Sequence, residues 1–239
     1  MRTKTKLAIT KRSFAALALF LLLLAGCGKP SAGLADTLPA GFVYAADAVP
    51  DVILEIRYYS AYNFVGTRVD DYLSPVAILT EQAANALRAA GKDLRGQGYA
   101  IKIFDAYRPQ GAVSHFMRWA ADEHDTLTKE YFYPDLKKNR LIPDGYIASR
   151  SGHSRGSTID LTIVDMRTGK EADMGSPFDF FGEISHHGTK HISDEQKRNR
   201  LILKNAMEKA GFKPYSAEWW HYTLINEPYP NTYFDFPVK

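Results

Sequence analysis

The chain has 239 residues, of which 30 are Lys or Arg and 27 are Asp or Glu, so its formal charge is +3. Five of the basic residues and no acidic residue lie in residues 1–26, and the rest of the chain therefore carries 25 basic and 27 acidic residues. Residues 27–239 have no basic excess that could hold a polyanion, and we expect no nucleic-acid partner.

Residues 1–26 have the pattern of an export signal. Basic residues precede an apolar run, Phe14–Ala25, which at 12 residues is shorter than the roughly 20 needed to span a membrane. Such a run is typical of the hydrophobic region of a signal peptide. The sequence Leu24-Ala25-Gly26-Cys27 resembles a bacterial lipobox, which predicts cleavage before Cys27 and lipidation of its thiol. An ordinary signal peptide with a chance cysteine, or an uncleaved anchor, is the alternative.

Cys27 is the only cysteine in the sequence, which excludes an intramolecular disulfide and a cysteine-ligated zinc site. The segment that follows is rich in Gly, Pro and Ala and predicts a flexible tether. We therefore expect a signal peptide in residues 1–26, a lipidated cysteine and tether in residues 27–40, and one domain in residues 41–239. This organisation predicts a protein of the cell envelope that contacts the membrane only through its N-terminal lipid.

The first half of the domain contains two predicted strands and two predicted helices. Residues 52–59 (VILEIRYY) are β-branched and aromatic, which predicts a strand. Thr80 is a suitable N-cap for a helix over residues 81–94, where apolar residues recur at helical spacing. Residues 99–104 (YAIKIF) predict another strand, and Pro109 suits the first turn of the helix that follows it.

The second half of the domain contains the clearest strand, residues 158–164 (TIDLTIV). Ser193 and Gln196 form a capping box for a helix that Gly211 closes. Residues 218–225 (EWWHYTLI) predict the last strand. Because strands and helices do not alternate as regular βαβ units, the fold class is α+β, with a central, mostly antiparallel sheet and flanking helices.

Polar residues interrupt the apolar pattern at three places, and one of them is Asp160. A carboxylate in a buried strand is costly unless it is paired or bound to a metal ion. His153 precedes it in a loop rich in Gly and Ser, and His221 lies in the last strand. Two histidines and one aspartate give zinc three ligands and leave the fourth position for water, as in catalytic sites. A buried ion pair between Asp160 and Arg155 is the alternative.

Glu218 is the predicted general base. Zinc lowers the pKa of a bound water to about 7, and a nearby carboxylate that is not a ligand can take its proton and pass it to a leaving amine. Residues three apart in a strand point to opposite faces, so Glu218 and His221 converge only if a bulge or bend separates them. Arg108, at the end of a predicted strand, suits an oxyanion, although an arginine beside a proline is as readily a surface or helix-start residue.

Two other patterns in the sequence offer alternatives to this site. The histidines at 186, 187 and 191 surround Gly188 and no carboxylate, which indicates a loop. The serines at 151, 154 and 157 lack the G-x-S-x-G pattern of a serine hydrolase nucleophile.

The motifs together resemble the VanX-type zinc D-alanyl-D-alanine dipeptidases. The three main ones are Ser-x-His-Ser-Arg-Gly-Ser-x-Ile-Asp-Leu-Thr (residues 151–162), Glu-Trp-Trp-His-Tyr (residues 218–222) and Asp-x-Tyr-Arg-Pro (residues 105–109). Further similar segments lie at residues 63–66, 174–180, 185–187 and 227–237. The resemblance runs from about residue 43 to the C-terminus, and the full set in this order is far more specific than any one motif.

The resemblance implies the mixed α+β fold of the zinc D,D-carboxypeptidases and the hedgehog signalling domain. It implies one zinc ion per chain, with ligands at His153, Asp160 and His221. It also implies that Glu218 is the general base and acid, with a local bend before His221, and that Arg108 lies at the transition-state oxyanion.

The resemblance also implies a set of substrate contacts. Asp179 lies where the family binds the free ammonium group of the dipeptide. Ser151 and Asp105 belong to the matched motifs and are predicted to contact substrate as well. Gly152 occupies a position where close relatives are expected to have a serine, and the missing hydroxyl is expected to alter substrate contacts.

The expected activity is the zinc-dependent hydrolysis of D-alanyl-D-alanine and similar small D-dipeptides, with no obligate protein partner. A zinc D,D- or L,D-carboxypeptidase that trims peptidoglycan stem peptides, and a non-catalytic zinc-bound envelope protein, are the alternatives. The leader is unexpected for this resemblance, because resistance dipeptidases act on newly made cytoplasmic dipeptide. An exported enzyme cannot deplete that pool, which favours dipeptides released from the wall.

Overall fold

The computed structural model describes residues 37–239, and the elements named here are those of this range. The strands are β1 (Phe42–Tyr44), β2 (Ile53–Leu54), β3 (Ile78–Thr80), β4 (Tyr99–Asp105), β5 (Thr158–Asp165), β6 (Phe212–Pro214) and β7 (His221–Leu224). The α-helices are α1 (Ala45–Ala48), α2 (Glu81–Gly96), α3 (Gln110–Ala121), α4 (Lys129–Phe132) and α5 (Asp194–Lys209). Short 3-10 helices cover Arg57–Tyr59, Lys138–Arg140, Gly152–Arg155 and Glu183–Ser185.

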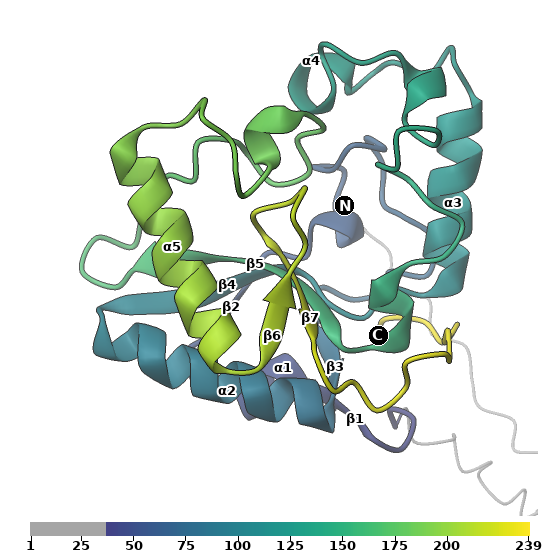
Figure 1. Cartoon of the computed structure of the whole chain (residues 1–239). Coiled ribbons are helices and arrows are strands. Elements are labelled where there is room, and N and C mark those ends of the chain that lie inside the picture. Colours follow the sequence, from purple (N-terminus) through teal and green to yellow (C-terminus); the bar gives the residue numbers. More distant parts are fainter. Residues whose placement is uncertain (1–36) are drawn as a thin grey trace, which may run out of the picture. The chain divides into compact units, whose positions relative to one another are not determined.

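The larger sheet of the described residues has five strands in the order β2-β4-β5-β7-β6 (Figure 1). Within it only β2 and β4 pair in parallel, and the other pairings are antiparallel. A separate antiparallel pair joins β1 and β3. Residues 38–239 form one compact unit. The predicted α+β class with a mostly antiparallel sheet is confirmed.

In Figure 1, α2 lies below the sheet and α4 above it, with α3 at the right and α5 at the left. The Thr80 side chain caps α2 by accepting a hydrogen bond from the Ala83 backbone N–H, as its sequence predicts. At the start of α5, Ser193 and Gln196 form the expected capping box. Gly211 follows α5 with φ +91°, a left-handed conformation that glycine adopts without strain.

Strand β5 lies at the centre of the sheet and is buried along Thr158–Val164. Its side chains alternate between the two faces, so Ile159, Leu161 and Ile163 share one face. Asp160 lies on the other face, where its buried carboxylate needs compensating charges. One face of the sheet is therefore apolar and packs into the core, and the other carries the buried carboxylate of Asp160.

Two predicted strands are shorter than the sequence indicates. The predicted strand over residues 52–59 ends after Leu54, and Arg57–Tyr59 form a 3-10 helix instead. Tyr58 is buried there and donates a hydrogen bond to Asp179, so tertiary contacts override the β propensity of this segment. The last strand begins at His221 rather than at residue 218, because Glu218 lies in the preceding turn.

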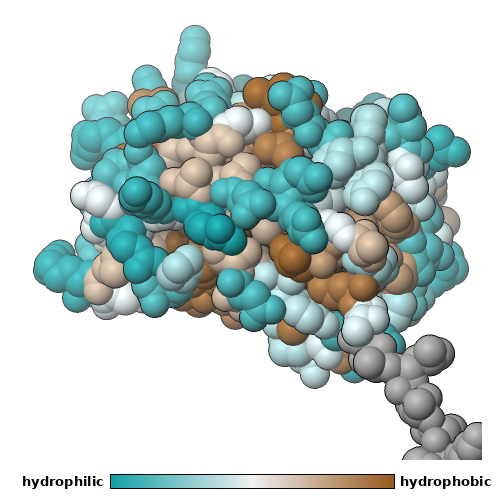
Figure 2. Space-filling model, turned by 90° about the horizontal axis from the view of Figure 1, so that it is seen from below, coloured by the Kyte–Doolittle hydropathy of each residue, from teal (hydrophilic) through white to brown (hydrophobic). Residues whose placement is uncertain are grey.

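Polar side chains cover most of the face seen from below, with hydrophobic patches scattered between them (Figure 2). No helix within residues 37–239 combines the length and the apolar character that a membrane crossing requires. The predicted signal peptide, Cys27 and most of the predicted tether lie outside the described residues.

Candidate metal centre and its cavity

Strand register places three polar residues in a row across the sheet. Asp105 in β4 lies opposite Asp160 in β5, and Asp160 lies opposite His221 in β7. Directly opposed residues project their side chains from the same face. A register shift between Ile103 and Asp105 makes this possible, because unbroken pairing would place Phe104 opposite Asp160. A β-bulge thus aims a second carboxylate at the site.

His153 reaches the same site from the 3-10 helix Gly152–Arg155. Ser151 caps this helix through a hydrogen bond from the His153 backbone N–H to its hydroxyl oxygen, at 3.2 Å. The ring atom Nδ1 of His153 lies 2.6 Å from the carbonyl oxygen of Ala106. Because a carbonyl oxygen only accepts, Nδ1 carries the proton and Nε2 presents its lone pair to the site.

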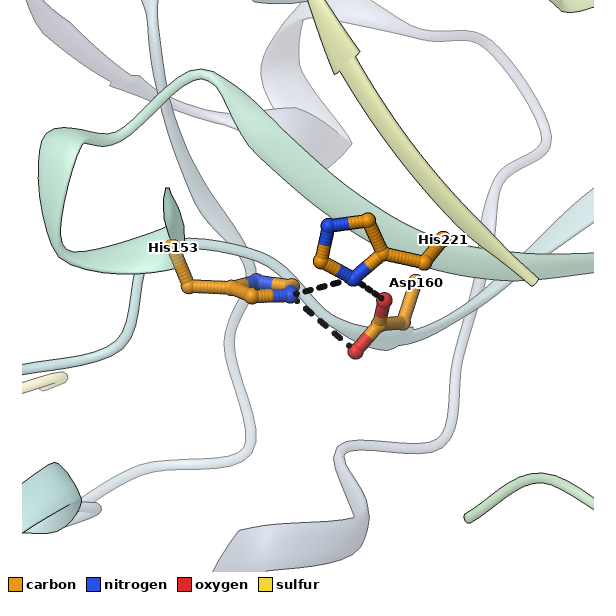
Figure 3. Close-up of side chains that lie close together, drawn as sticks. All are labelled: His153, Asp160 and His221. Carbon is orange, nitrogen blue, oxygen red and sulfur yellow. Dashed lines mark hydrogen bonds and ion pairs between the residues drawn. The ribbon is translucent and has the colours of Figure 1, made fainter. Parts of the chain in front are cut away.

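The three predicted ligands converge (Figure 3). His153 Nε2 lies 3.2 Å from Asp160 Oδ2 and 3.4 Å from His221 Nδ1, and His221 Nδ1 lies 3.1 Å from Asp160 Oδ1. Ligand atoms around a tetrahedral zinc ion at 2.0–2.2 Å are separated by about 3.3 Å. No other group of three such residues within residues 37–239 comes together in this way. The donor atoms of these three residues therefore lie close enough together to hold one metal ion.

The charges at this site also favour a cation. Burial raises the pKa of Asp160, but His153 and His221 outweigh it and hold that pKa below its ordinary value. Burial lowers the pKa of His221, whereas Asp160 and Glu218 raise it, to about 10 overall. Asp160 Oδ1 is buried and forms no well-shaped hydrogen bond with any described residue. A metal ion would supply positive charge to compensate these carboxylates.

Glu218 lies beside the ligands without being one of them. Its Oε2 atom is 3.2 Å from His221 Nδ1, and its side chain keeps 25% of its surface exposed. The backbone N–H of His221 donates to the Glu218 carbonyl, which marks a turn between the two residues. The bend that the sequence analysis required is therefore present, and both side chains face the same cavity.

Arg108 is held rigidly at the edge of the centre. Its Nε and Nη2 atoms both lie 2.9 Å from Asp105 Oδ2, and Nη2 lies 3.6 Å from Asp160 Oδ2. The rings of Tyr58 and Phe116 flank the guanidinium group, with centroids 4.9 and 5.1 Å from its carbon. This guanidinium cannot turn away from the cavity without losing these contacts.

Asp105 lies behind Arg108 rather than in the cavity. Its carboxylate is fully buried and accepts a hydrogen bond of 2.5 Å from the Tyr72 hydroxyl. The cavity wall does not include it. The predicted contact of Asp105 with substrate is therefore not supported. Its oxygens instead bind Tyr72 and Arg108, and the second contact positions the Arg108 guanidinium.

Asp179 is a buried carboxylate in the wall of the cavity. Its backbone has φ +62°, a left-handed conformation that aspartate and asparagine tolerate better than most residues. The Tyr58 hydroxyl donates to Asp179 Oδ2 at 2.9 Å. Burial raises the pKa of Asp179 well above its ordinary value, since one hydroxyl compensates little of the lost hydration.

Arg200, which the sequence analysis did not single out, fastens the loop that carries Asp179. Its buried guanidinium donates to the carbonyl oxygens of Met174 at 2.7 Å, Ile184 at 2.8 Å and His186 at 2.9 Å. The signal was present in the sequence, because Arg200 falls in the buried stripe of α5 with Leu203 and Met207. An arginine in such a stripe indicates a buried set of acceptors.

Trp219 ties the same loop to the strand that carries His221. Its indole N–H donates to Ser176 Oγ at 3.0 Å, and its backbone N–H donates to the Ser185 carbonyl at 2.9 Å. Ser176 and Ser185 are themselves hydrogen bonded at 3.1 Å. The residues on both sides of the site are thus anchored to each other.

The cavity has a volume of about 210 Å³, which suits a small ligand. All three predicted metal ligands line it, together with Arg108, Ser151, Asp179 and Glu218. Gly152 lines it too, but a Cβ there would lie 3.0 Å from Thr158 Oγ1 and 3.4 Å from Arg155 Nη2. A Cβ at 152 would accordingly require Thr158 to shift slightly, and the expected effect of the missing hydroxyl on substrate contacts stays a prediction.

Neither Arg155 nor the histidine loop belongs to the group of metal ligands. Arg155 pairs with Glu227 at 2.8 Å instead of with Asp160, so the alternative ion pair is not formed. The residues from His186 to His191 form a loop, as predicted. Burial lowers the pKa of His187 to about 4, which keeps this ring neutral.

Comparison with known proteins identifies the family. The profile of the peptidase M15 family, described as D-ala-D-ala dipeptidase, matches residues 39–239. The chain belongs to this D-ala-D-ala dipeptidase family. A D-alanyl-D-alanine dipeptidase of Enterococcus faecium is 46% identical over 199 residues, covering 83% of this chain and 98% of that protein. One of Streptomyces coelicolor is 39% identical over 197 residues, covering 82% and 98%.

Membership in the D-ala-D-ala dipeptidase family confirms the resemblance drawn from the motifs and makes the chain a peptidase. A more distant D-alanyl-D-alanine dipeptidase, from Escherichia coli, is 34% identical over 175 residues, covering 73% of this chain and 80% of that protein. Peptidases of this family are metal-dependent, and His153, Asp160 and His221 are the residues that can hold the metal ion here.

Proposed function

We propose that this protein hydrolyses D-alanyl-D-alanine and similar small D-dipeptides with one zinc ion per chain. The observation that carries the proposal is the convergence of His153, Asp160 and His221 beside the carboxylate of Glu218. Zinc is favoured because two imidazoles and one carboxylate give it three ligands and an open fourth position. The relatives that carry the name D-alanyl-D-alanine dipeptidase support the choice of substrate.

When bound, zinc polarises the scissile carbonyl group and makes a water molecule more acidic. Glu218 accepts the proton of the attacking water and then delivers it to the leaving amine. Its partial exposure and its position 3.2 Å from His221 give it access to both. Arg108 stabilises the oxyanion, because its guanidinium is held in place by Asp105 before substrate arrives.

Asp179 selects substrates with a free amino end. Burial leaves the Asp179 carboxylate poorly compensated, as its raised pKa indicates, so a cation would stabilise its charged form. The ammonium group of a dipeptide supplies that cation. An N-acylated peptide offers no such charge and leaves Asp179 unpaired. This contrast separates the proposed dipeptidase from a carboxypeptidase that trims stem peptides.

The first prediction is that the purified chain hydrolyses D-alanyl-D-alanine far faster than an N-acylated D-Ala-D-Ala tripeptide, and that a chelator abolishes the activity. Removal of the metal is also expected to lower the Tm, because the ion binds only the folded state. Measurements of metal content, hydrolysis of a panel of D- and L-dipeptides, and thermal unfolding with and without zinc check this.

Preference for the acylated peptide would favour the carboxypeptidase instead. Zinc bound in stoichiometric amount with no hydrolysis of any peptide would favour a non-catalytic binding protein. Activity that survives complete removal of the metal would contradict both zinc enzymes.

We further propose that the enzyme acts in the cell envelope, exported and lipid-anchored at Cys27, on dipeptides released from the wall. The basic N-terminal segment, the apolar run and the sequence Leu24-Ala25-Gly26-Cys27 support this. No protein partner and no nucleic acid are part of the proposal.

The second prediction follows from that anchor. Cys27→Ala is expected to abolish incorporation of labelled fatty acid and to move the protein from the membrane fraction, with hydrolysis by the folded domain unchanged. Fractionation and labelling of the full chain check this, and equal labelling of both forms would contradict it. Vancomycin tolerance, compared with and without the intact leader, separates action on newly made cytoplasmic dipeptide from action on dipeptides released from the wall. A large effect from the exported form alone would contradict action on wall-derived dipeptides.

A further inference from the structure

The cavity wall contains two arginines, and they differ in how far their charges are used. Arg108 is buried among Asp105, Asp160 and two aromatic rings. Arg150 is exposed and lines the same cavity. Within residues 37–239 no carboxylate lies within ion-pair distance of Arg150. Its guanidinium carbon lies 5.2 Å from the centroid of the Tyr233 ring, a cation–π contact.

A neighbouring arginine shows the contrast. Arg155 also lies over Tyr233, at 5.8 Å, but its Nε atom donates to Glu227 at 2.8 Å. Its charge is therefore compensated within the protein, whereas that of Arg150 is open to a ligand.

The backbone around Arg150 is fixed on both sides. Gln110 donates to the Ser149 carbonyl at 2.8 Å, and Ser151 caps the 3-10 helix that carries His153. This backbone holds the base of the Arg150 side chain at the cavity wall, where the planar donors of its guanidinium suit a carboxylate.

We infer that Arg150 binds the C-terminal carboxylate of the substrate. This inference rests on the proposed dipeptidase function and extends it, because Asp179 and Arg150 then recognise the two ends of the same molecule. Together with a cavity of about 210 Å³, two end charges restrict substrates to two residues. Arg150 is thus a specificity-determining residue.

The test compares D-alanyl-D-alanine with its C-terminal amide, using the zinc-loaded enzyme. Arg150→Gln is expected to lower kcat/KM for the dipeptide by about tenfold to a hundredfold, mainly through KM, with little change for the amide. Arg150→Lys is expected to restore part of the loss, because lysine keeps the charge without the planar donors. Arg68→Gln is the matched control, since Arg68 is exposed, lies 6.0 Å from the Tyr59 ring and does not line the cavity.

An equal loss for the dipeptide and the amide would overturn the inference, because Arg150 would then only shape the entrance. No loss for either substrate would also overturn it. Zinc content and Tm, expected to be unchanged in Arg150→Gln, exclude a folding defect.

A binding measurement separates this inference from the proposed function. Calorimetry with D-alanyl-D-alanine on the zinc-loaded Glu218→Gln protein, with and without Arg150→Gln, reports carboxylate recognition without hydrolysis. Weaker binding only in the double variant supports Arg150 even if the wild-type enzyme hydrolyses a different dipeptide. Equal binding by both proteins rejects Arg150 and leaves the proposed hydrolysis standing.

Discussion

Glu218→Ala is expected to keep its zinc and to lose turnover of D-alanyl-D-alanine. The Glu218 carboxylate lies 3.2 Å from the ligand atom of His221 but is not one of the three converging ligands, so removing it leaves the donor set intact. General acid–base catalysis is worth about 10²- to 10⁴-fold, and kcat should fall by that factor. Metal analysis and steady-state kinetics on the same preparation measure both effects.

Glu130→Ala is the control for this prediction, because Glu130 is exposed on α4 and lies outside the cavity. It should leave both zinc content and kcat unchanged. If Glu218→Ala retains full turnover, another group moves the proton. If it loses its zinc, Glu218 belongs to the metal centre rather than to the proton transfer.

Asp179→Asn is expected to damage recognition and to stabilise the fold. Loss of the carboxylate should lower kcat/KM for D-alanyl-D-alanine by about 10²-fold, because an ammonium group loses its charged partner. Activity on the N-acetylated dipeptide should change little, so the preference for a free amino end should disappear. Asparagine can still accept the Tyr58 hydrogen bond and tolerates φ +62°.

The stabilisation follows from the pKa of Asp179, which burial raises well above its ordinary value. Above the unfolded pKa of about 3.9 the native state binds the proton more tightly than the unfolded chain does. The free energy of unfolding contributed by this group is therefore fully present below that pKa and is lost as pH rises through the folded pKa. At pH 7, Asp179→Asn removes this unfavourable contribution, and the Tm should rise by at least about 2 °C.

Asp51→Asn provides a control with similar backbone geometry. Asp51 has φ +57° but is exposed, and its surface ion pair with Arg95 contributes little. Its Tm should stay within about 1–2 °C of the wild-type value at pH 7. The gain of Asp179→Asn over wild type should shrink as pH is lowered toward 5, and a constant gain would show that the raised pKa is not its source.

The metal centre could be predicted because its chemistry leaves a mark in the sequence. A carboxylate in a strand of β-branched residues needs compensation, and a histidine in the preceding loop and another in the last predicted strand can supply it. The helix caps at Thr80 and Ser193 could also be predicted from the sequence, since each depends on a local hydrogen bond. Local rules of this kind depend only on neighbouring residues.

Other parts of the site depend on contacts that no local pattern records. The bulge that brings Asp105 opposite Asp160 arises from pairing between β4 and β5, which lie about 55 residues apart in the sequence. The turn that separates Glu218 from His221 runs against the β propensity of its aromatic residues. The proposed role of Asp179 rests on family resemblance, because its loop has no periodicity that would predict a buried carboxylate.

The hydrogen bonds from Arg200 and Trp219 have a consequence for how such an enzyme can change its preference among substrates. They join the segment that carries Asp179 to both α5 and the polypeptide that carries Glu218 and His221. Selection of the amino end and the hydrolytic machinery therefore share one rigid frame, and altering one disturbs the other. Variants that accept different dipeptides are more easily reached from residues 145–148, 150 and 151, which line the cavity outside that frame.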